Sequence, residues 1–208
     1  MMSHERYYKL VLAHAVVMSL AILWFIPIAI FAAKFFRRPA NTKLEGSGKT
    51  WKTIHILSNV TATALIIAGF TLGYYASGNN FQVGVKNVHF IVGLTFFVGI
   101  LVQALAGPVM TLYFAARKRT SRPLLNYVHI TLGYLITLLG AANIWLGLQF
   151  YGSPHYLYGL WIAAVAAWLI LYAVGIPLRK KYESRQQVYH EEAKVPRDSD
   201  HSSDGYRE

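Results

Sequence analysis

Residues 124–149 have the sequence LLNYVHITLGYLITLLGAANIWLGLQ, which contains no Asp, Glu, Lys or Arg and yet holds a histidine at position 129. A helix of roughly 20 apolar residues spans the ~30 Å of hydrocarbon in a bilayer. The uncharged stretch around this segment, from Pro123 to Leu178, is longer still. We interpret residues 124–149 as a transmembrane helix.

Four further segments have the same composition. The polar turn at residues 152–154 divides the stretch up to Leu178 into two spans, and three earlier uncharged stretches are each long enough for one more. The sequence therefore predicts an all-α membrane protein, in which the first four helices form a bundle and the fifth is peripheral. The predicted helices cover residues 8–36, 51–76, 86–115, 124–149 and 156–178.

The charge distribution predicts the orientation. The formal net charge is +11, and fourteen of the twenty Lys and Arg residues lie at one side of the bundle: six in 34–52, four in 117–122 and four in 179–185. Cytoplasmic loops are enriched in these residues. We expect the N-terminus outside or in a lumen, the C-terminus in the cytosol, the lipid bilayer as partner and no nucleic acid. The sequence does not distinguish the plasma membrane from endomembranes.

The rest of the composition limits the chemistry. The chain has no cysteine, which excludes disulfides, thiolate metal sites and iron–sulfur clusters. We expect a membrane domain over residues 1–182 and a disordered cytosolic tail over 183–208, where acidic, basic and serine residues replace apolar ones. No cleavable signal precedes the first span, so the first helix is expected to serve as the targeting signal.

Four of the eight histidines lie inside predicted spans: His14, His55, His89 and His129. An ionisable side chain in a span is costly and normally faces the bundle interior at a functional site. Each lies in the first two turns of its helix, and successive helices run in opposite directions. His14 and His89 therefore belong to the outer leaflet, and His55 and His129 to the inner one. Two such pairs suit two planar tetrapyrroles, each with one axial imidazole per side; hydrogen bonds between helices are the alternative.

Small residues accompany the histidines on three of the four helices. Offsets of 4, 11, 14 and 18 residues stay within about 40° of the starting direction at about 3.6 residues per turn. We expect Gly93 and Gly133, one turn after a histidine, to make room for a porphyrin edge, although ordinary packing of membrane helices also favours glycine. The faces contain Gly93, Ile100, Gln103 and Gly107 after His89; Gly133, Gly140, Asn143 and Gly147 after His129; Asn59, Ile66, Gly69 and Gly73 after His55; and the bulkier Met18, Phe25, Ile28 and Ala32 after His14.

Polar residues near the histidines have candidate roles too. Asn59, Gln103 and Asn143 are candidate partners for the imidazole N–H groups. Lys52 and Arg122 belong to the basic loops just beyond the inner pair, where cations would neutralise haem propionates or attract an anionic donor. Membrane topology and anionic lipid headgroups explain these cations equally well.

The sequence resembles the eukaryotic cytochrome b561 family over about residues 8–178, in the version often fused to an extracellular DOMON domain. Four blocks in order carry the resemblance: residues 12–14 with Met18, residues 51–55, residues 89–93 with Gln103 and 107–108, and residues 126–133 with Asn143 and 146–148.

The resemblance implies two haem b groups, one held by His14 and His89 on the outer side and one by His55 and His129 on the cytosolic side. It also implies electron transfer from a cytosolic donor, ascorbate in the best-known branch, to an outer acceptor such as ferric iron, monodehydroascorbate or a partner redox domain. Bis-imidazole ligation leaves no open iron site, so no catalytic residue is predicted. The choice between a transmembrane reductase and a simple electron carrier stays open, as does homodimer formation.

Two other functions are alternatives. A haem-free proton or metal-ion transporter would use the intramembrane histidines. It would also be expected to have acidic partners in the spans, and no Asp or Glu lies between Trp51 and Leu178. A structural membrane anchor of a redox complex would differ from an electron carrier only in its partners.

Overall fold

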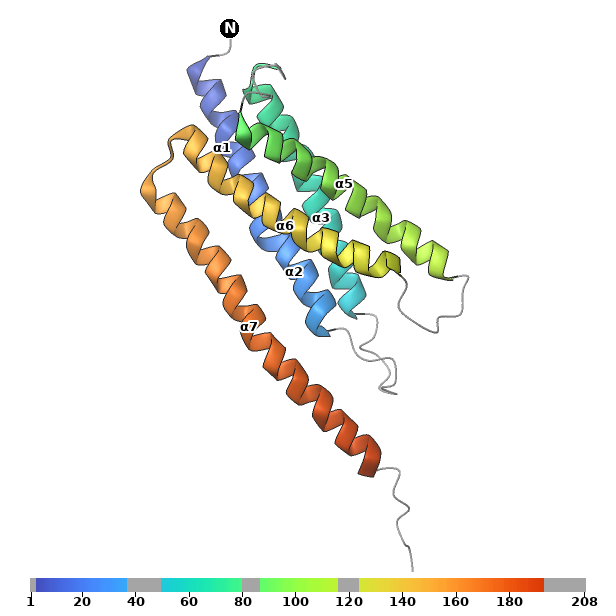
Figure 1. Ribbon diagram of the computed structural model, residues 1–208. Coiled ribbons are helices and arrows are strands. Elements are labelled where there is room, and N and C mark those ends of the chain that lie inside the picture. The colour runs from blue at the N-terminus through green and yellow to red at the C-terminus, as the bar shows by residue number, and fades with distance from the viewer. Residues whose placement is uncertain (1–2, 37–49, 80–86, 116–123, 193–208) are drawn as a thin grey trace, which may run out of the picture. The chain divides into compact units, whose positions relative to one another are not determined.

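The computed structural model describes residues 3–36, 50–79, 87–115 and 124–192, and this part of the chain contains helices and no strand. Five of its helices are long and apolar enough to cross a membrane, which confirms the predicted all-α membrane fold (Figure 1). The chain divides into two compact units, Met1–Leu169 and Ile170–Glu208. The first unit contains all four intramembrane histidines.

The first span is one continuous run of four helical pieces, in which two α-helical segments alternate with two π-helical ones. The other four spans are single α-helices close to their predicted bounds, except at the C-terminal end of the last. The elements are α1 (His4–Leu20), η1 (Ala21–Phe25), α2 (Ile26–Phe31), η2 (Ala32–Phe36), α3 (Thr50–Ala76), α5 (Val88–Ala115), α6 (Leu124–Tyr151) and α7 (His155–Glu192).

Helix α7 is longer than predicted. It continues past Leu178 to Glu192, so residues 183–192 are helical and the prediction of disorder is wrong there; residues 193–208 of the predicted tail lie outside the described part. An ion pair one turn apart, Arg179 Nε to Glu183 Oε1 at 2.7 Å, supports the helix in this polar region. The division into a domain over 1–182 and a tail stays a prediction.

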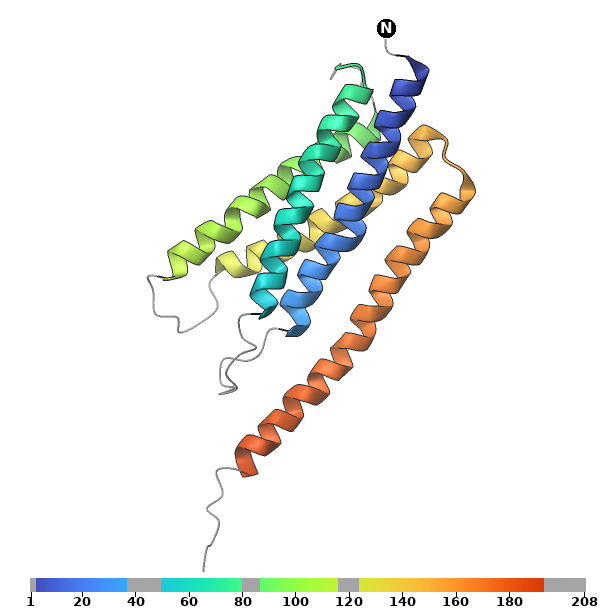
Figure 2. The same ribbon diagram turned by 180° about the vertical axis from the view of Figure 1, so that it is seen from behind.

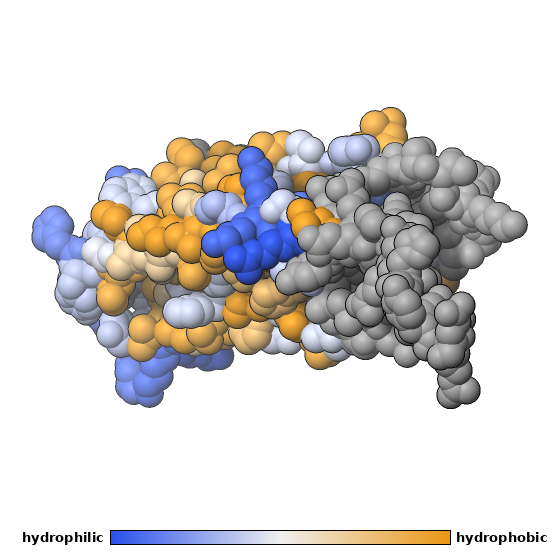
Figure 3. Space-filling view, turned by 90° about the horizontal axis from the view of Figure 1, so that it is seen from below, coloured by the Kyte–Doolittle hydropathy of each residue, from blue (hydrophilic) through white to orange (hydrophobic). Residues whose placement is uncertain are grey.

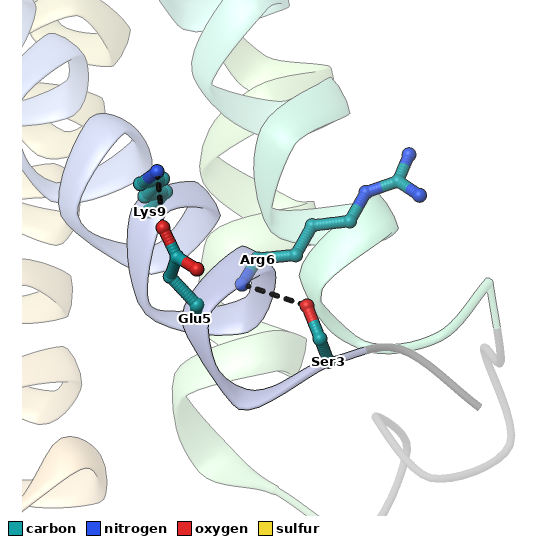
Figure 4. A network of polar contacts seen from close by, with 4 residues as sticks. All are labelled: Ser3, Glu5, Arg6 and Lys9. Carbon is teal, nitrogen blue, oxygen red and sulfur yellow. Dashed lines mark hydrogen bonds and ion pairs between the residues drawn. The ribbon is translucent and has the colours of Figure 1, made fainter.

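Helix α1 begins at a well-formed N-cap (Figure 4). The Ser3 hydroxyl accepts a hydrogen bond from the Arg6 backbone N–H at 3.3 Å and so satisfies one of the free amides of the first turn. Glu5 in that turn complements the helix dipole and pairs with Lys9 at 2.6 Å. Polar chemistry thus fixes the start of the helix only a few residues before its apolar span.

The first unit is built from two helix pairs. Helices α1 and α2 pack along α3, and α5 packs along α6 (Figures 1 and 2). Large apolar side chains from all four spans meet in the middle, where Phe96, Ile66 and Ile22 are almost completely buried. Ile136 from α6 completes this central layer. The four histidines lie towards the ends of the bundle, outside the layer.

Many large apolar side chains are exposed, and in the face that Figure 3 shows they lie among hydrophilic ones. Leu105 and Leu112 on α5 are 71% and 74% exposed, and Leu138 on α6 is 67% exposed. Such exposure would be unfavourable in water but is favourable in a bilayer, where hydrocarbon covers these side chains. The exposed leucines therefore indicate the lipid-facing surfaces.

Two tryptophans of α7 form hydrogen bonds with other helices of the first unit. Trp161 Nε1 donates to the Ala141 carbonyl at 3.0 Å, and Trp168 Nε1 donates to the Leu23 carbonyl at 2.7 Å. In an α-helix the Leu23 carbonyl would pair with the amide of residue 27, but that residue is Pro27 and has no N–H. The indole of Trp168 gives this carbonyl, close to the proline, a side-chain donor.

Trp168→Phe is expected to lower the free energy of unfolding by about 1 kcal/mol, because it leaves the Leu23 carbonyl without the indole N–H. Equilibrium unfolding of the detergent-solubilised protein measures the change. Trp24→Phe is the matched control, since Trp24 is 55% exposed on the same span as Leu23. Equal stabilities of the two variants would contradict this account.

Candidate functional site

The structure brings the four intramembrane histidines together in the two predicted pairs. The ring centroids of His14 and His89 lie 6.2 Å apart with an interplanar angle of 90°, and those of His55 and His129 lie 6.4 Å apart at 73°. The first pair is beside the C-terminal half of α3 and the second beside its N-terminus, because His14 contacts Gly69 while His55 is itself in the first turns of α3. The two pairs therefore lie at opposite ends of the bundle.

The spacing within each pair suits one metal ion between two imidazoles. An imidazole nitrogen binds a metal such as zinc at about 2.0–2.1 Å, and the ring centroid lies about 1.1 Å behind that nitrogen, so two opposed ligand rings have centroids about 6.3 Å apart. The observed 6.2 and 6.4 Å agree with this value. In bis-imidazole haem, the macrocycle lies between the rings and supplies the other four nitrogens.

Main-chain carbonyls hold three of the four rings through Nδ1. His14 Nδ1 lies 2.7 Å from the Gly69 oxygen, His55 Nδ1 lies 2.9 Å from the Ala29 oxygen, and His89 Nδ1 lies 3.0 Å from the Asn143 oxygen. A carbonyl only accepts, so Nδ1 must be the protonated nitrogen in each neutral ring. Nε2 then keeps its lone pair, as a metal ligand requires.

Of the three amide side chains predicted as partners, that of Asn143 forms a hydrogen bond with His89, whereas those of Asn59 and Gln103 donate to main-chain carbonyls. Asn59 Nδ2 lies 3.4 and 3.3 Å from the two ring nitrogens of His55 but donates at 2.8 Å to the His55 carbonyl. Gln103 Nε2 donates to the His129 carbonyl at 3.1 Å. Asn59 and Gln103 therefore brace the backbone of the histidine helices, while main-chain oxygens of neighbouring helices orient three of the four rings.

The acceptor carbonyls lie about four turns after the histidine of their own helix. The interval from His55 to Gly69 equals that from His129 to Asn143. The interval from His14 to Ala29 is one residue longer. The π-helical turn η1 explains the difference, because a π-bulge accommodates one extra residue. The prediction for this helix face is therefore wrong at two positions, because Ile26 and Ala29 are buried where Phe25 and Ile28 were expected; Ala32, also predicted on this face, is buried.

Glycines allow two of the rings to approach these carbonyls. A Cβ atom at Gly73 would come within 2.9 Å of His14 Nδ1, and one at Gly147 within 2.9 Å of His89 Cε1. Each of these glycines lies one turn after an acceptor residue, Gly69 or Asn143. Met18 lies against Gly69 and is buried, so it packs at this position.

Gly93 and Gly133 face amide side chains. A Cβ at Gly93 would lie 2.9 Å from Asn143 Nδ2, and one at Gly133 would lie 3.9 Å from Gln103 Nε2. Room for a porphyrin edge beside these glycines stays a prediction.

The eukaryotic cytochrome b561 family model matches residues 13–152, which include all four histidines of the two pairs. The chain belongs to the eukaryotic cytochrome b561 family. No curated protein and no solved structure matches it. Membership in the cytochrome b561 family supports haem b as cofactor, electron transfer across the membrane as function, and redox donors and acceptors as partners.

Each histidine pair offers two protein ligands to a cofactor. Among the described residues, no group of three or more His, Cys, Asp and Glu side chains comes together. A zinc site takes three or four protein ligands. Two imidazoles are the axial ligands that haem iron takes in a bis-histidine site, so the residues of each pair fit haem b, and their role as ligands stays a prediction.

The predicted basic residues are only partly described. Lys52 is exposed in the first turn of α3, and Arg122 lies outside the described residues. Sequence reasoning did not single out Lys34, whose Nζ lies 5.9 Å from the centroid of the Tyr134 ring. Tyr134 follows His129 on α6, so Lys34 contributes a cation towards the His55 end of the bundle.

Proposed function

We propose that this cytochrome b561 holds two b-type haems in series across the membrane, with His14 and His89 as axial ligands of the outer one and His55 and His129 of the cytosolic one. The observation that carries the proposal is the pair of ring spacings, 6.2 and 6.4 Å, at opposite ends of one bundle. Each pair draws on two different spans, so each suits a planar group between helices.

The separation of the two pairs suits sequential electron transfer. On α6, His129 belongs to one pair and the Asn143 carbonyl contacts the other. The interval corresponds to about 21 Å at 1.5 Å per residue. An apolar layer lies between the two pairs and contains Phe96, Ile66, Ile22 and Ile136.

The residues of the chain would bind the haems and orient the histidine rings that hold them. The Nδ1 contacts to Gly69, Ala29 and Asn143 fix the tautomer and the ring orientation, so Nε2 is free to bind iron. Haem supplies the one-electron redox chemistry when bound. With both axial positions taken by histidine, no residue has to act as a general acid or base.

We place the donor on the cytosolic side and the acceptor outside or in a lumen, from the basic residues at the end of the bundle that contains His55 and His129. An ascorbate-like reductant is the proposed donor, and ferric iron, monodehydroascorbate or a partner redox domain the proposed acceptor. Lys52 and Arg122 are proposed to neutralise propionates or attract the anionic donor.

The reduced-minus-oxidised absorption spectrum of the purified protein, with pyridine haemochrome stoichiometry, tests the proposal. We expect two low-spin b haems per chain. A folded protein with no haem would overturn the proposal and favour the transporter alternative, and one haem per chain would refute the two-centre arrangement.

A further inference from the structure

Helices α5 and α6 each carry a histidine, two glycines and a side-chain amide at the same intervals. Gly93, Gln103 and Gly107 follow His89 in α5 at the intervals at which Gly133, Asn143 and Gly147 follow His129 in α6. The two helices pack together in opposite directions, since His89 near the start of α5 contacts Asn143 in the second half of α6. Each helix therefore presents an equivalent surface to the histidine of the other.

The contact on α6 is complete. The Asn143 carbonyl accepts the Nδ1–H of His89, and Gly147 leaves room for the ring, because a Cβ there would come within 2.9 Å of His89 Cε1. The same two elements occur on α3, where Gly69 and Gly73 receive His14. An acceptor carbonyl followed one turn later by glycine thus holds both rings of the outer pair.

On α5, the equivalent residues lie level with His129, but the hydrogen bond to its ring is missing. Gln103 lies level with His129, because its Nε2 donates to the His129 carbonyl at 3.1 Å. The buried Nδ1 of His129 has no hydrogen-bond partner among the described residues, and a Cβ at Gly107 would have no neighbour within 4 Å. Of the four intramembrane histidines, only His129 thus has an unpaired Nδ1.

We propose that Gln103 is the positioning residue of His129: in the haem-loaded protein its main-chain oxygen accepts the Nδ1–H, and Gly107 leaves room for the ring. With this contact, each of the four histidine rings would have a main-chain acceptor for its Nδ1–H. The contact would also fix the tautomer of His129 and make its Nε2 a stronger donor to iron. A more basic axial imidazole favours ferric iron, so loss of the contact should raise the midpoint potential of that centre. The inference rests on the proposed two-haem function.

Gly107→Ala tests the proposed contact between His129 and Gln103. Its predicted effect differs between the described position of the His129 ring and a position over Gly107. With His129 as in the described structure, the added methyl group meets nothing. With His129 over Gly107, it pushes the ring away from the Gln103 carbonyl. Gly147→Ala is the matched positive variant for His89. Gly159→Ala, on α7 and also without a neighbour within 4 Å, is the negative control.

The measurements are a redox titration, EPR of the two ferric low-spin centres, and haem transfer to apomyoglobin. In Gly107→Ala the centre that depends on His129 should shift its potential upward, change its EPR signal and lose haem about 10–100-fold more readily, as expected when an outer hydrogen-bond partner of a metal ligand is lost. The other centre should stay as in the wild type. Gly147→Ala should shift the centre that depends on His89 and leave the centre that depends on His129 as in the wild type. Gly159→Ala should leave both centres as in the wild type.

Wild-type behaviour of both centres in Gly107→Ala, with two haems bound, would overturn the inference and leave the two-haem proposal intact. A wild-type protein without two haems would instead overturn the proposed function. If Gly107→Ala does not accumulate, Gly107→Ser is the second variant, because its side chain also occupies the space that the His129 ring would need in order to reach the Gln103 carbonyl. Unchanged potentials in that variant would exclude a positioning role for Gln103.

Discussion

Replacing His89 with alanine is expected to remove one haem and leave the other in place. His89 is paired with His14 at 6.2 Å, and the second pair lies about 21 Å away along the helices, so the loss of one axial ligand should not reach it. The haem content should fall to about half of the wild-type value, as measured by pyridine haemochrome analysis. One of the two steps in the redox titration should disappear with it.

His129→Ala should have the complementary effect and remove the step that His89→Ala retains. His155→Ala is the control, because His155 is exposed at the start of α7 and belongs to neither pair. Loss of both haems in a folded His89→Ala bundle would show that the pairing is wrong. So would loss of the same redox step in both variants.

The sequence predicted the spans and the pairing for a simple physical reason. A bilayer requires long uncharged helices, and antiparallel neighbours place alternate histidines at opposite depths. The four histidines could therefore be assigned to two layers without any side-chain geometry, and the ring spacings of 6.2 and 6.4 Å agree with that assignment.

The acceptors of the imidazole N–H groups could not be predicted in the same way. They are main-chain oxygens of Gly69, Ala29 and Asn143, and every residue has such an oxygen, so no residue type marks them. The glycine one turn later is the only signal on α3 and α6. On the first span the π-helical turn η1 moves the register by one residue, which a 3.6-residue periodicity cannot reveal; Pro27 just after it was the only indication.

The C-terminal half of α7 was mispredicted for another reason. Polar composition indicates that a segment is not buried, but it does not exclude helix. Arg179 and Glu183 form an ion pair one turn apart, and such pairs support an exposed helix. The loss of apolar residues after Leu178 marks the end of the apolar span and not the end of the helix.

Phe96→Ala is expected to destabilise the bundle by about 3–5 kcal/mol while leaving both haems bound. Phe96 is 0% exposed and lies so close to Gly140 that a Cβ there would come within 2.5 Å of the ring. Truncation leaves a cavity in the central layer, which the tightly packed helices fill only in part. Both histidine pairs lie outside this layer, so their ligand geometry should persist at temperatures below unfolding.

Thermal unfolding followed by the Soret band and by far-UV circular dichroism separates stability from haem binding. Leu105→Ala is the matched control, because Leu105 is 71% exposed on the same helix and its truncation leaves no internal cavity. A stable Phe96→Ala variant would mean that the central layer does not hold the bundle together. Selective loss of one haem would mean that Phe96 belongs to a haem pocket, and the separation of the two centres by an apolar layer would then have to be abandoned.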